Sequence, residues 1–225
     1  MIVITGPGRS GTSFLAALYR SLKFDPGGGW RDDVRAGYEE FETVKINDEL
    51  CKRLSVQFGT PRPPFGSERW DLVPALAESF GPEMRDLSTR WEVVKDPRFC
   101  WTLPVWAMAE ARIDHVVVTL RRVDDVVASG QHAGMTNAED LQDVNKRCST
   151  VMFRVGALLT ALREYQLPHT VLMFPDYLAD PERLYHQLVF PGPVTKRKFR
   201  RALKKTLKPE YITFGGGRMP VAGSG

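Results

Sequence analysis

The distribution of hydrophobic and polar residues predicts short buried strands that alternate with amphipathic helices. Continuous apolar runs rich in β-branched residues predict strands at residues 1–5, 92–96, 115–120 and 169–174. Apolar residues spaced three and four positions apart predict helices at 14–22, 38–55, 70–80, 137–165, 181–188 and 194–208, and a further helix begins at 123–129. Alternating strands and helices are typical of a parallel sheet with helices on both faces, so we expect a single α/β domain.

The predicted domain spans residues 1–215, and residues 216–225 are expected to form a flexible tail. Residues 59–66 contain three prolines and are predicted to form a surface loop. The segment 194–208 is predicted to be a basic helix, because Phe199, Leu203 and Leu207 recur at four-residue spacing between cations.

The positive charge of the chain is concentrated in that basic helix. The chain has a net charge of +4, and residues 194–208 hold eight Lys and Arg residues and no acid. The rest of the chain therefore carries more acidic than basic residues. We expect a docked helix with a solvated basic face; the alternative is that some of these cations face an anionic ligand. No nucleic-acid-binding motif accompanies them, so no nucleic-acid partner is expected.

Composition and spacing also exclude several classes of site. The three cysteines are too few and too widely spaced for a disulfide framework or a zinc motif, and the four histidines have no metal-like spacing, so no metal is expected. The longest apolar runs, such as 116–118, are too short to span a membrane. No secretory leader opens the sequence, and a cytoplasmic location is expected.

The segment that follows the first predicted strand has the composition of an anion-binding loop. Its residues are Gly6-Pro7-Gly8-Arg9-Ser10-Gly11-Thr12-Ser13. A strand, a glycine-rich turn and a helix start bring backbone N–H groups and the positive end of the helix dipole together. The spacing of Gly6 and Gly11 fits the phosphate-binding loop of nucleotide hydrolases and kinases, but Thr12 stands where that motif needs lysine. Arg9 supplies a cation instead; the alternative is an ordinary glycine turn.

Charged residues also follow two later strands. Lys95-Asp96-Pro97-Arg98 follows the strand at 92–96, and Arg121 ends the strand at 115–120, eight residues before Ser129. Ligands of parallel α/β sheets bind beyond the carboxyl ends of the strands, so these residues are expected at the ligand edge. A solvated turn is the alternative for residues 95–98.

Together these segments resemble the bacterial sulfotransferases that use 3′-phosphoadenosine 5′-phosphosulfate (PAPS), which have a P-loop-like fold. Residues 8–13 are similar to the family's 5′-phosphosulfate loop, and Arg121 with Ser129 is similar to its 3′-phosphate segment. Further similar segments are Gly37-Tyr38-Glu39-Glu40 with Asn47-Asp48, Lys95-Asp96-Pro97-Arg98, and residues 175–181. The resemblance covers most of residues 2–190 in the same order.

The resemblance implies that a sulfuryl group moves from PAPS to a hydroxyl or amine of a small-molecule or carbohydrate acceptor, leaving PAP, with no metal. The implied donor-binding residues are Gly8, Arg9, Ser10, Gly11, Thr12, Ser13, Arg121 and Ser129. Arg9 and Lys95 are expected to offset charge on the leaving phosphate.

The acceptor also needs a general base. Glu40 is the first candidate, and its alternative is a carboxylate that stabilises a helix start. His132 is the second candidate, whose alternative is a surface histidine, and Asp96 is the third.

Two other functions stay open. One is a small P-loop kinase, which requires ATP and magnesium. The presence of Thr12 where the P-loop motif has lysine argues against it. A non-enzymatic module that binds anions or polysaccharides through the basic helix requires that removing residues 194–225 abolishes all ligand binding.

Overall fold

The central sheet consists of four parallel strands in the order β4-β1-β5-β6. Their bounds are β1, Ile2–Thr5; β4, Val93–Lys95; β5, His115–Leu120; and β6, His169–Met173. This computed structural model describes residues 1–31, 36–56, 68–132, 144–207, 213–214 and 217–218.

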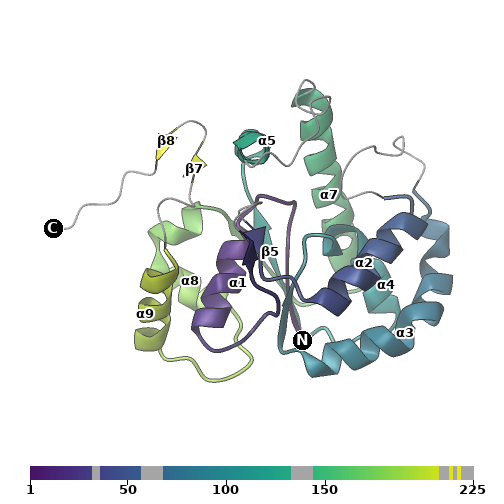
Figure 1. Cartoon of the computed structure of the whole chain (residues 1–225), viewed down its shortest axis with the longest axis horizontal. Helices are drawn as coiled ribbons and strands as arrows, with labels where there is room; N and C mark the ends of the chain where they lie inside the picture. The colour runs from purple at the N-terminus through teal and green to yellow at the C-terminus, as the bar shows by residue number, and fades with distance from the viewer. Residues whose placement is uncertain (32–35, 57–67, 133–143, 208–212, 215–216, 219–225) are drawn as a thin grey trace.

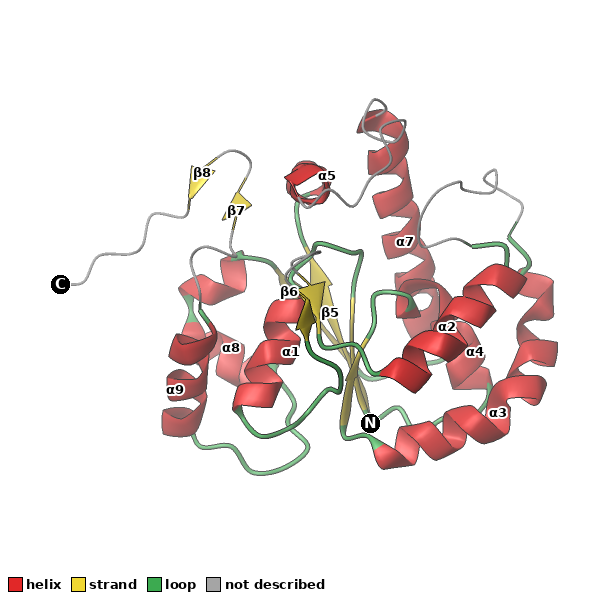
Figure 2. Ribbon diagram, viewed as in Figure 1, coloured by secondary structure: helices red, strands yellow, loops and turns green. Residues whose placement is uncertain are grey.

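Helices cover both faces of the sheet, which confirms the predicted α/β fold (Figures 1 and 2). One face carries α1 (Thr12–Ser21), α8 (Pro181–Gln187) and α9 (Lys196–Thr206), and the other carries α2 (Phe41–Arg53), α3 (Val73–Arg90), α4 (Phe99–Met108) and α7 (Val144–Glu164). The helix α5 (Val123–His132) follows β5.

Alternation of side chains along β1 explains the two hydrophobic cores. Ile2 and Ile4 pack toward α1, α8 and α9, whereas Val3 packs toward α2, α3, α4 and α7. Successive side chains of a strand point to opposite faces, so a strand covered on both sides is apolar throughout. The uninterrupted apolar run at the start of the sequence is therefore the signature of a central strand.

The short elements complete the chain. They are the paired strands β2 (Trp30–Arg31) and β3 (Ala36–Gly37), the paired strands β7 (Thr213–Phe214) and β8 (Gly217–Arg218), and the 3-10 helices η1 (Trp70–Leu72) and η2 (Asp176–Ala179). Two-residue strands have no periodicity to detect, and the sequence analysis did not predict them.

The predicted elements agree with the structure apart from their ends. The helix expected at 38–55 begins at Phe41, because residues 36–37 form β3. The long helix expected at 137–165 is α7, and its predicted first turns, like the predicted loop at 59–66, lie outside the described residues. Gly217–Arg218, in the predicted flexible tail, pairs with Thr213–Phe214, and the other residues of the tail lie outside the described part of the chain.

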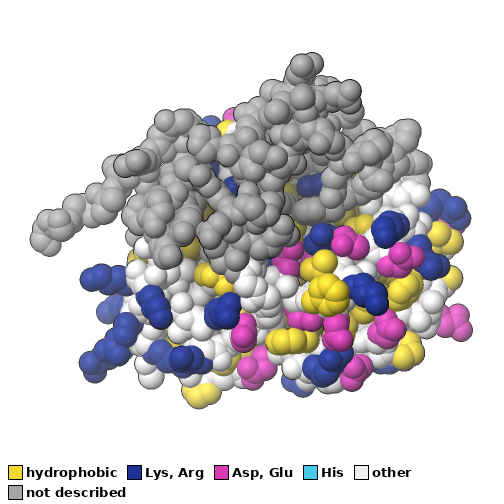
Figure 3. Space-filling model, viewed as in Figure 1, with side chains coloured by type: hydrophobic (Ala, Val, Ile, Leu, Met, Phe, Trp, Pro, Cys, Tyr) yellow, Lys and Arg dark blue, Asp and Glu magenta, His cyan; other side chains and the backbone are white. Residues whose placement is uncertain are grey.

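The predicted basic helix is α9, which has a buried apolar stripe and an exposed basic face. Phe199, Ala202 and Leu203 are buried, while its Lys and Arg residues are exposed. Figure 3 shows Lys and Arg side chains gathered on the left of the molecule, where α9 lies, and a mixture of acidic, basic and apolar side chains on the right. None of the helices in the described ranges combines the length and apolar character that crossing a membrane requires.

The chain leaves two adjacent strands in opposite directions. The helix after β1, α1, lies on one face, and the helix after β4, α4, lies on the other. In open parallel sheets such a divergence creates a crevice at the carboxyl ends of the strands, where ligands bind. The loop after β1 and the residues after β4 both lie at this edge of the sheet, which we call the ligand edge.

Candidate functional site

The loop between β1 and α1 lies directly against β5. A β-carbon on Gly6 would lie 2.1 Å from the carbonyl oxygen of Thr119, so only glycine fits there. Ser10 Oγ lies 3.0 Å from Thr119 Oγ1, which fixes the far side of the loop to the same strand. Gly11 adopts a φ of 97°, in the left-handed region that favours glycine. These contacts fix the entry into α1.

The first turn of α1 has the properties of an anion site. In the described structure, no side chain caps this helix and no acid lies in its first turn. The N-terminal amides and the helix dipole therefore favour a negative charge there. Thr12 is buried in this turn, and Ser13 Oγ lies 3.4 Å from the backbone nitrogen of Gly37.

The two predicted anion-binding segments meet in the structure. Arg9 Nε donates a hydrogen bond of 3.1 Å to Ser129 Oγ, across 120 positions of sequence. Arg121 Nη1 lies 3.4 Å from the carbonyl oxygen of Arg9 and donates to it. The residues singled out after β1 and after β5 therefore form one cationic corner of the ligand edge.

Arg121 is a largely desolvated cation. Its side chain is only 4% exposed, and its guanidinium carbon lies 5.5 Å from the centre of the Phe174 ring. Burial lowers the pKa of Arg121, while Asp125, at 4.0 Å, opposes that shift. A cation that has lost much of its hydration gains more from an anionic ligand than an exposed cation does.

Lys95 lies at the β4 end of the ligand edge and is paired with a carboxylate. It ends β4, where it is paired in register with Ile4 of β1, and its side chain is 1% exposed. Nζ of Lys95 lies 2.5 Å from Glu39 Oε1, and Glu39 Oε2 lies 3.7 Å from Arg98 Nη1. Glu39 belongs to the segment Gly37-Tyr38-Glu39-Glu40, whose pattern predicts no role for it.

Glu40, the first candidate base, caps α2. Its Oε1 accepts a hydrogen bond of 2.9 Å from the backbone N–H of Glu42, and its Oε2 accepts one of 2.7 Å from that of Thr43. The side chain is buried. These contacts are those of the alternative, a carboxylate that stabilises a helix start.

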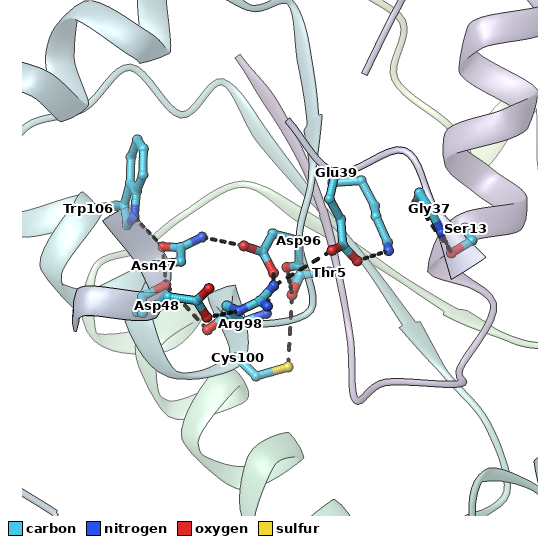
Figure 4. A network of polar contacts seen from close by, with 12 residues as sticks. Thr5, Ser13, Gly37, Glu39, Asn47, Asp48, Asp96, Arg98, Cys100 and Trp106 are labelled. Carbon is cyan, nitrogen blue, oxygen red and sulfur yellow. Dashed lines mark hydrogen bonds and ion pairs between the residues drawn. The ribbon is translucent and has the colours of Figure 1, made fainter. Parts of the chain in front are cut away.

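Asp96, the third candidate base, belongs to a buried network that joins α2 to α4 (Figure 4). Asn47 Nδ2 donates to Asp96 at 2.9 Å, and Asn47 Oδ1 accepts from Thr102 and Trp106 at 2.7 and 2.8 Å. Burial raises the pKa of the Asp96 carboxyl, and the nearby charge of Arg98 opposes the shift. Asp96 is fully buried and held by these partners, which suits a structural role.

Arg98 completes this network at the surface. Its Nε donates to Asp48 Oδ1 at 2.5 Å, and its Nη1 donates to Asp96 Oδ1 at 3.0 Å. Because both partners are carboxylates, the positive charge of Arg98 is compensated within the protein. The segment 95–98 is therefore more than the solvated turn that was its alternative.

The remaining candidates lie apart from this network. His132 is the last residue of α5, and its side chain lies outside the described structure. The cations of α9 lie on a helix that packs on α1 and α8, and Lys196 and Arg200 pair with Glu182. Among the described residues, no three His, Cys, Asp or Glu side chains gather as a metal ion would require.

Comparison with known proteins adds no relative to this picture. No protein-family model matches the chain, and no curated protein matches it either.

Proposed function

We propose that the protein is a sulfotransferase that uses PAPS as its donor. The observation that carries this proposal is the contact between the loop after β1 and the residues after β5, through Arg9, Ser129 and Arg121. PAPS carries a phosphosulfate on the 5′ position and a phosphate on the 3′ position of one ribose. Two cationic sites that touch each other suit two anionic groups on the same sugar.

A linear triphosphate fits the same residues less well. In nucleotide hydrolases the lysine at the end of the loop reaches the β- and γ-phosphates, and here that position is Thr12. The cation that the loop offers is Arg9, which hydrogen-bonds toward Ser129. This arrangement favours a 3′,5′-substituted nucleotide over ATP.

The residues are arranged to assist sulfuryl transfer without covalent participation of the protein. The acceptor oxygen attacks sulfur, the bond between sulfur and the phosphate oxygen breaks, and the electron pair stays on the leaving PAP. The amides of the loop, Arg9 and Lys95 would offset the charge that develops on that oxygen. Arg121 and Ser129 would hold the 3′-phosphate and so orient the donor. The acceptor is a hydroxyl or amine of a small molecule or carbohydrate.

A thermal-unfolding comparison of PAP, AMP and ATP with magnesium tests the proposal. A ligand present at one hundred times its dissociation constant stabilises a protein by about 2.7 kcal/mol, which is readily measured. We expect PAP to raise the unfolding temperature well above AMP or ATP with magnesium at equal concentration. Stabilisation by ATP with magnesium alone would favour the kinase. Loss of all binding when the exposed Lys204 and Lys205 of α9 are replaced by glutamine would favour the anion-binding module.

A further inference from the structure

Glu39 lies between the donor loop and the network after β4. Its carboxylate contacts Lys95 and approaches Arg98, and Figure 4 places it between Gly37 with Ser13 on one side and Asp96 with Arg98 on the other. The side chain of Glu39 is 30% exposed, whereas that of Lys95 is 1% exposed. One end of this ion pair is therefore open to a ligand while the other is buried.

The backbone around Glu39 is held on both sides. Gly37 contacts Ser13 in the first turn of α1 through its backbone nitrogen, and Glu40 caps α2. Gly28 packs so closely that a β-carbon there would lie 2.3 Å from the carbonyl oxygen of Glu39. A carboxylate on so constrained a segment keeps its position when its partner moves.

The neighbouring carboxylates are committed to other partners. Both oxygens of Glu40 accept backbone N–H groups, and Asp96 is fully buried against Asn47 and Arg98. Asp48 pairs with Arg98 on the far side of the network. Among the described residues, Glu39 is the carboxylate paired with Lys95.

We propose that Glu39 is the general base of the transfer and that donor binding activates it by drawing Lys95 away. Before PAPS binds, Glu39 neutralises the buried ammonium, which would otherwise lack compensation. The phosphosulfate, which carries more than one negative charge, then competes for Lys95 from the adjacent loop. The released carboxylate accepts the proton of the acceptor O–H as its oxygen bonds to sulfur and the bond from sulfur to phosphate breaks. The proton later passes to water.

This inference rests on the proposed function. It predicts that one substitution, Glu39→Gln, strengthens PAPS binding but slows the transfer. Glu39→Gln keeps the shape of the side chain and removes its charge, so Lys95 no longer has to leave a carboxylate. We expect PAPS to bind about tenfold more tightly to the variant than to the wild type, a coupling of usual size. The same substitution removes the proton acceptor and should slow transfer by about 10²–10⁴-fold.

Calorimetric titration of PAPS without acceptor measures the first effect, and release of PAP from PAPS with water as acceptor measures the second. Glu42→Gln is the matched control: Glu42 lies three residues away, is half-exposed and pairs with Arg90, so it reports the effect of losing one negative charge nearby. Glu39→Asp should recover part of the rate.

Unchanged or weaker binding of PAPS to Glu39→Gln than to Glu42→Gln would overturn the displacement of Lys95. A wild-type rate in Glu39→Gln would overturn the role of Glu39 as the base and make Glu40 the next residue to test. Failure of the wild type to bind PAPS would instead count against the proposed function, so the two failures are distinct.

Discussion

The cations at the two ends of the ligand edge have different kinds of partner. At the end formed by the loop after β1 and by β5, Arg9 donates to the hydroxyl of Ser129, and Arg121 donates to a backbone carbonyl, with Asp125 at 4.0 Å. At the end formed by β4, Lys95 and Arg98 donate to carboxylates at 2.5–3.0 Å.

This difference suggests that the β5 end binds an anionic ligand, whereas the cations at the β4 end are neutralised by carboxylates of the protein. Hydroxyl and carbonyl partners orient an arginine without cancelling its charge. Asp125 offsets part of the charge of Arg121, and Arg9 and Arg121 lie close together, so we expect the β5 end to attract an anionic ligand. Carboxylate partners cancel the charge, so the β4 end has little attraction for an anion until a partner is displaced. We therefore expect loss of a cation at the β5 end to weaken donor binding and slow transfer. At the β4 end we expect loss of a buried partner to reduce stability, and loss of the carboxylate that holds Lys95 to strengthen donor binding and slow the chemical step.

The largest expected effect at the β5 end is that of Arg9→Ala on the rate of sulfuryl transfer. Loss of a charge-assisted contact to the phosphosulfate should cost about 2–5 kcal/mol, a fall in rate of roughly 30- to 5,000-fold. Arg9 already adopts a φ of 70°, so alanine there adds no new backbone strain. The rate of PAP release from PAPS measures the effect.

Arg122→Ala provides the matched control, because Arg122 is exposed and directly follows Arg121. Its rate should stay near that of the wild type. Equal losses in the two variants would mean that a general reduction of positive charge, rather than the loop, controls the rate.

At the β4 end, Asn47→Ala should chiefly reduce stability. The substitution removes the partner of Trp106 Nε1 and one partner each of Thr102 and Asp96, which keep their hydrogen bonds to Arg98. We expect a loss of about 3–5 kcal/mol in the free energy of unfolding. Denaturant unfolding measures it, and Glu49→Ala, on the exposed side of the same helix, should cost under about 1 kcal/mol. A strong loss of PAP affinity in Asn47→Ala with unchanged stability would contradict the structural role of the β4 end and make it part of the donor site.

The sequence predicted the strands of the sheet, most of the helices and the cationic segments, because these depend on local patterns. It did not predict α4 (Phe99–Met108), which is apolar on most sides and so has no amphipathic spacing to detect. Short stretches of sequence are enough to detect these patterns. They are the apolar runs of β1 and β5, the glycines at positions 6 and 11, and the spacing of Arg121 and Ser129. The contact of Arg9 with Ser129 could not be predicted in this way. It depends on β5 lying beside β1, and the connections between strands do not determine that order.

The role of Glu39 was missed for a related reason. Glu39 and Lys95 are separated by 56 positions, and adjacent glutamates at 39 and 40 look equivalent in the sequence. Only the start of α2 at Phe41 distinguishes them, because it makes Glu40 the cap and leaves Glu39 to face Lys95. A capping pattern predicts a helix start but cannot say which distant cation the preceding residue meets.

The smallest expected effect is that of the basic face of α9 on donor affinity. Lys204 and Lys205 are exposed on a helix that packs on α1 and α8, and their charges are screened by salt. The double substitution Lys204→Gln and Lys205→Gln should change the dissociation constant of PAP by less than about twofold at physiological ionic strength. A large loss would extend the donor site to α9 and support the anion-binding module.

The central claim is that the β5 end binds the 3′-phosphate of the donor, and calorimetric titration of PAP and AMP tests it most directly. The wild type should bind PAP far more tightly than AMP, which lacks that phosphate. Arg121→Ala should remove about 2–5 kcal/mol of this difference and Ser129→Ala about 1–3 kcal/mol, while the affinity for AMP hardly changes. Equal affinity of the wild type for PAP and AMP would contradict the claim.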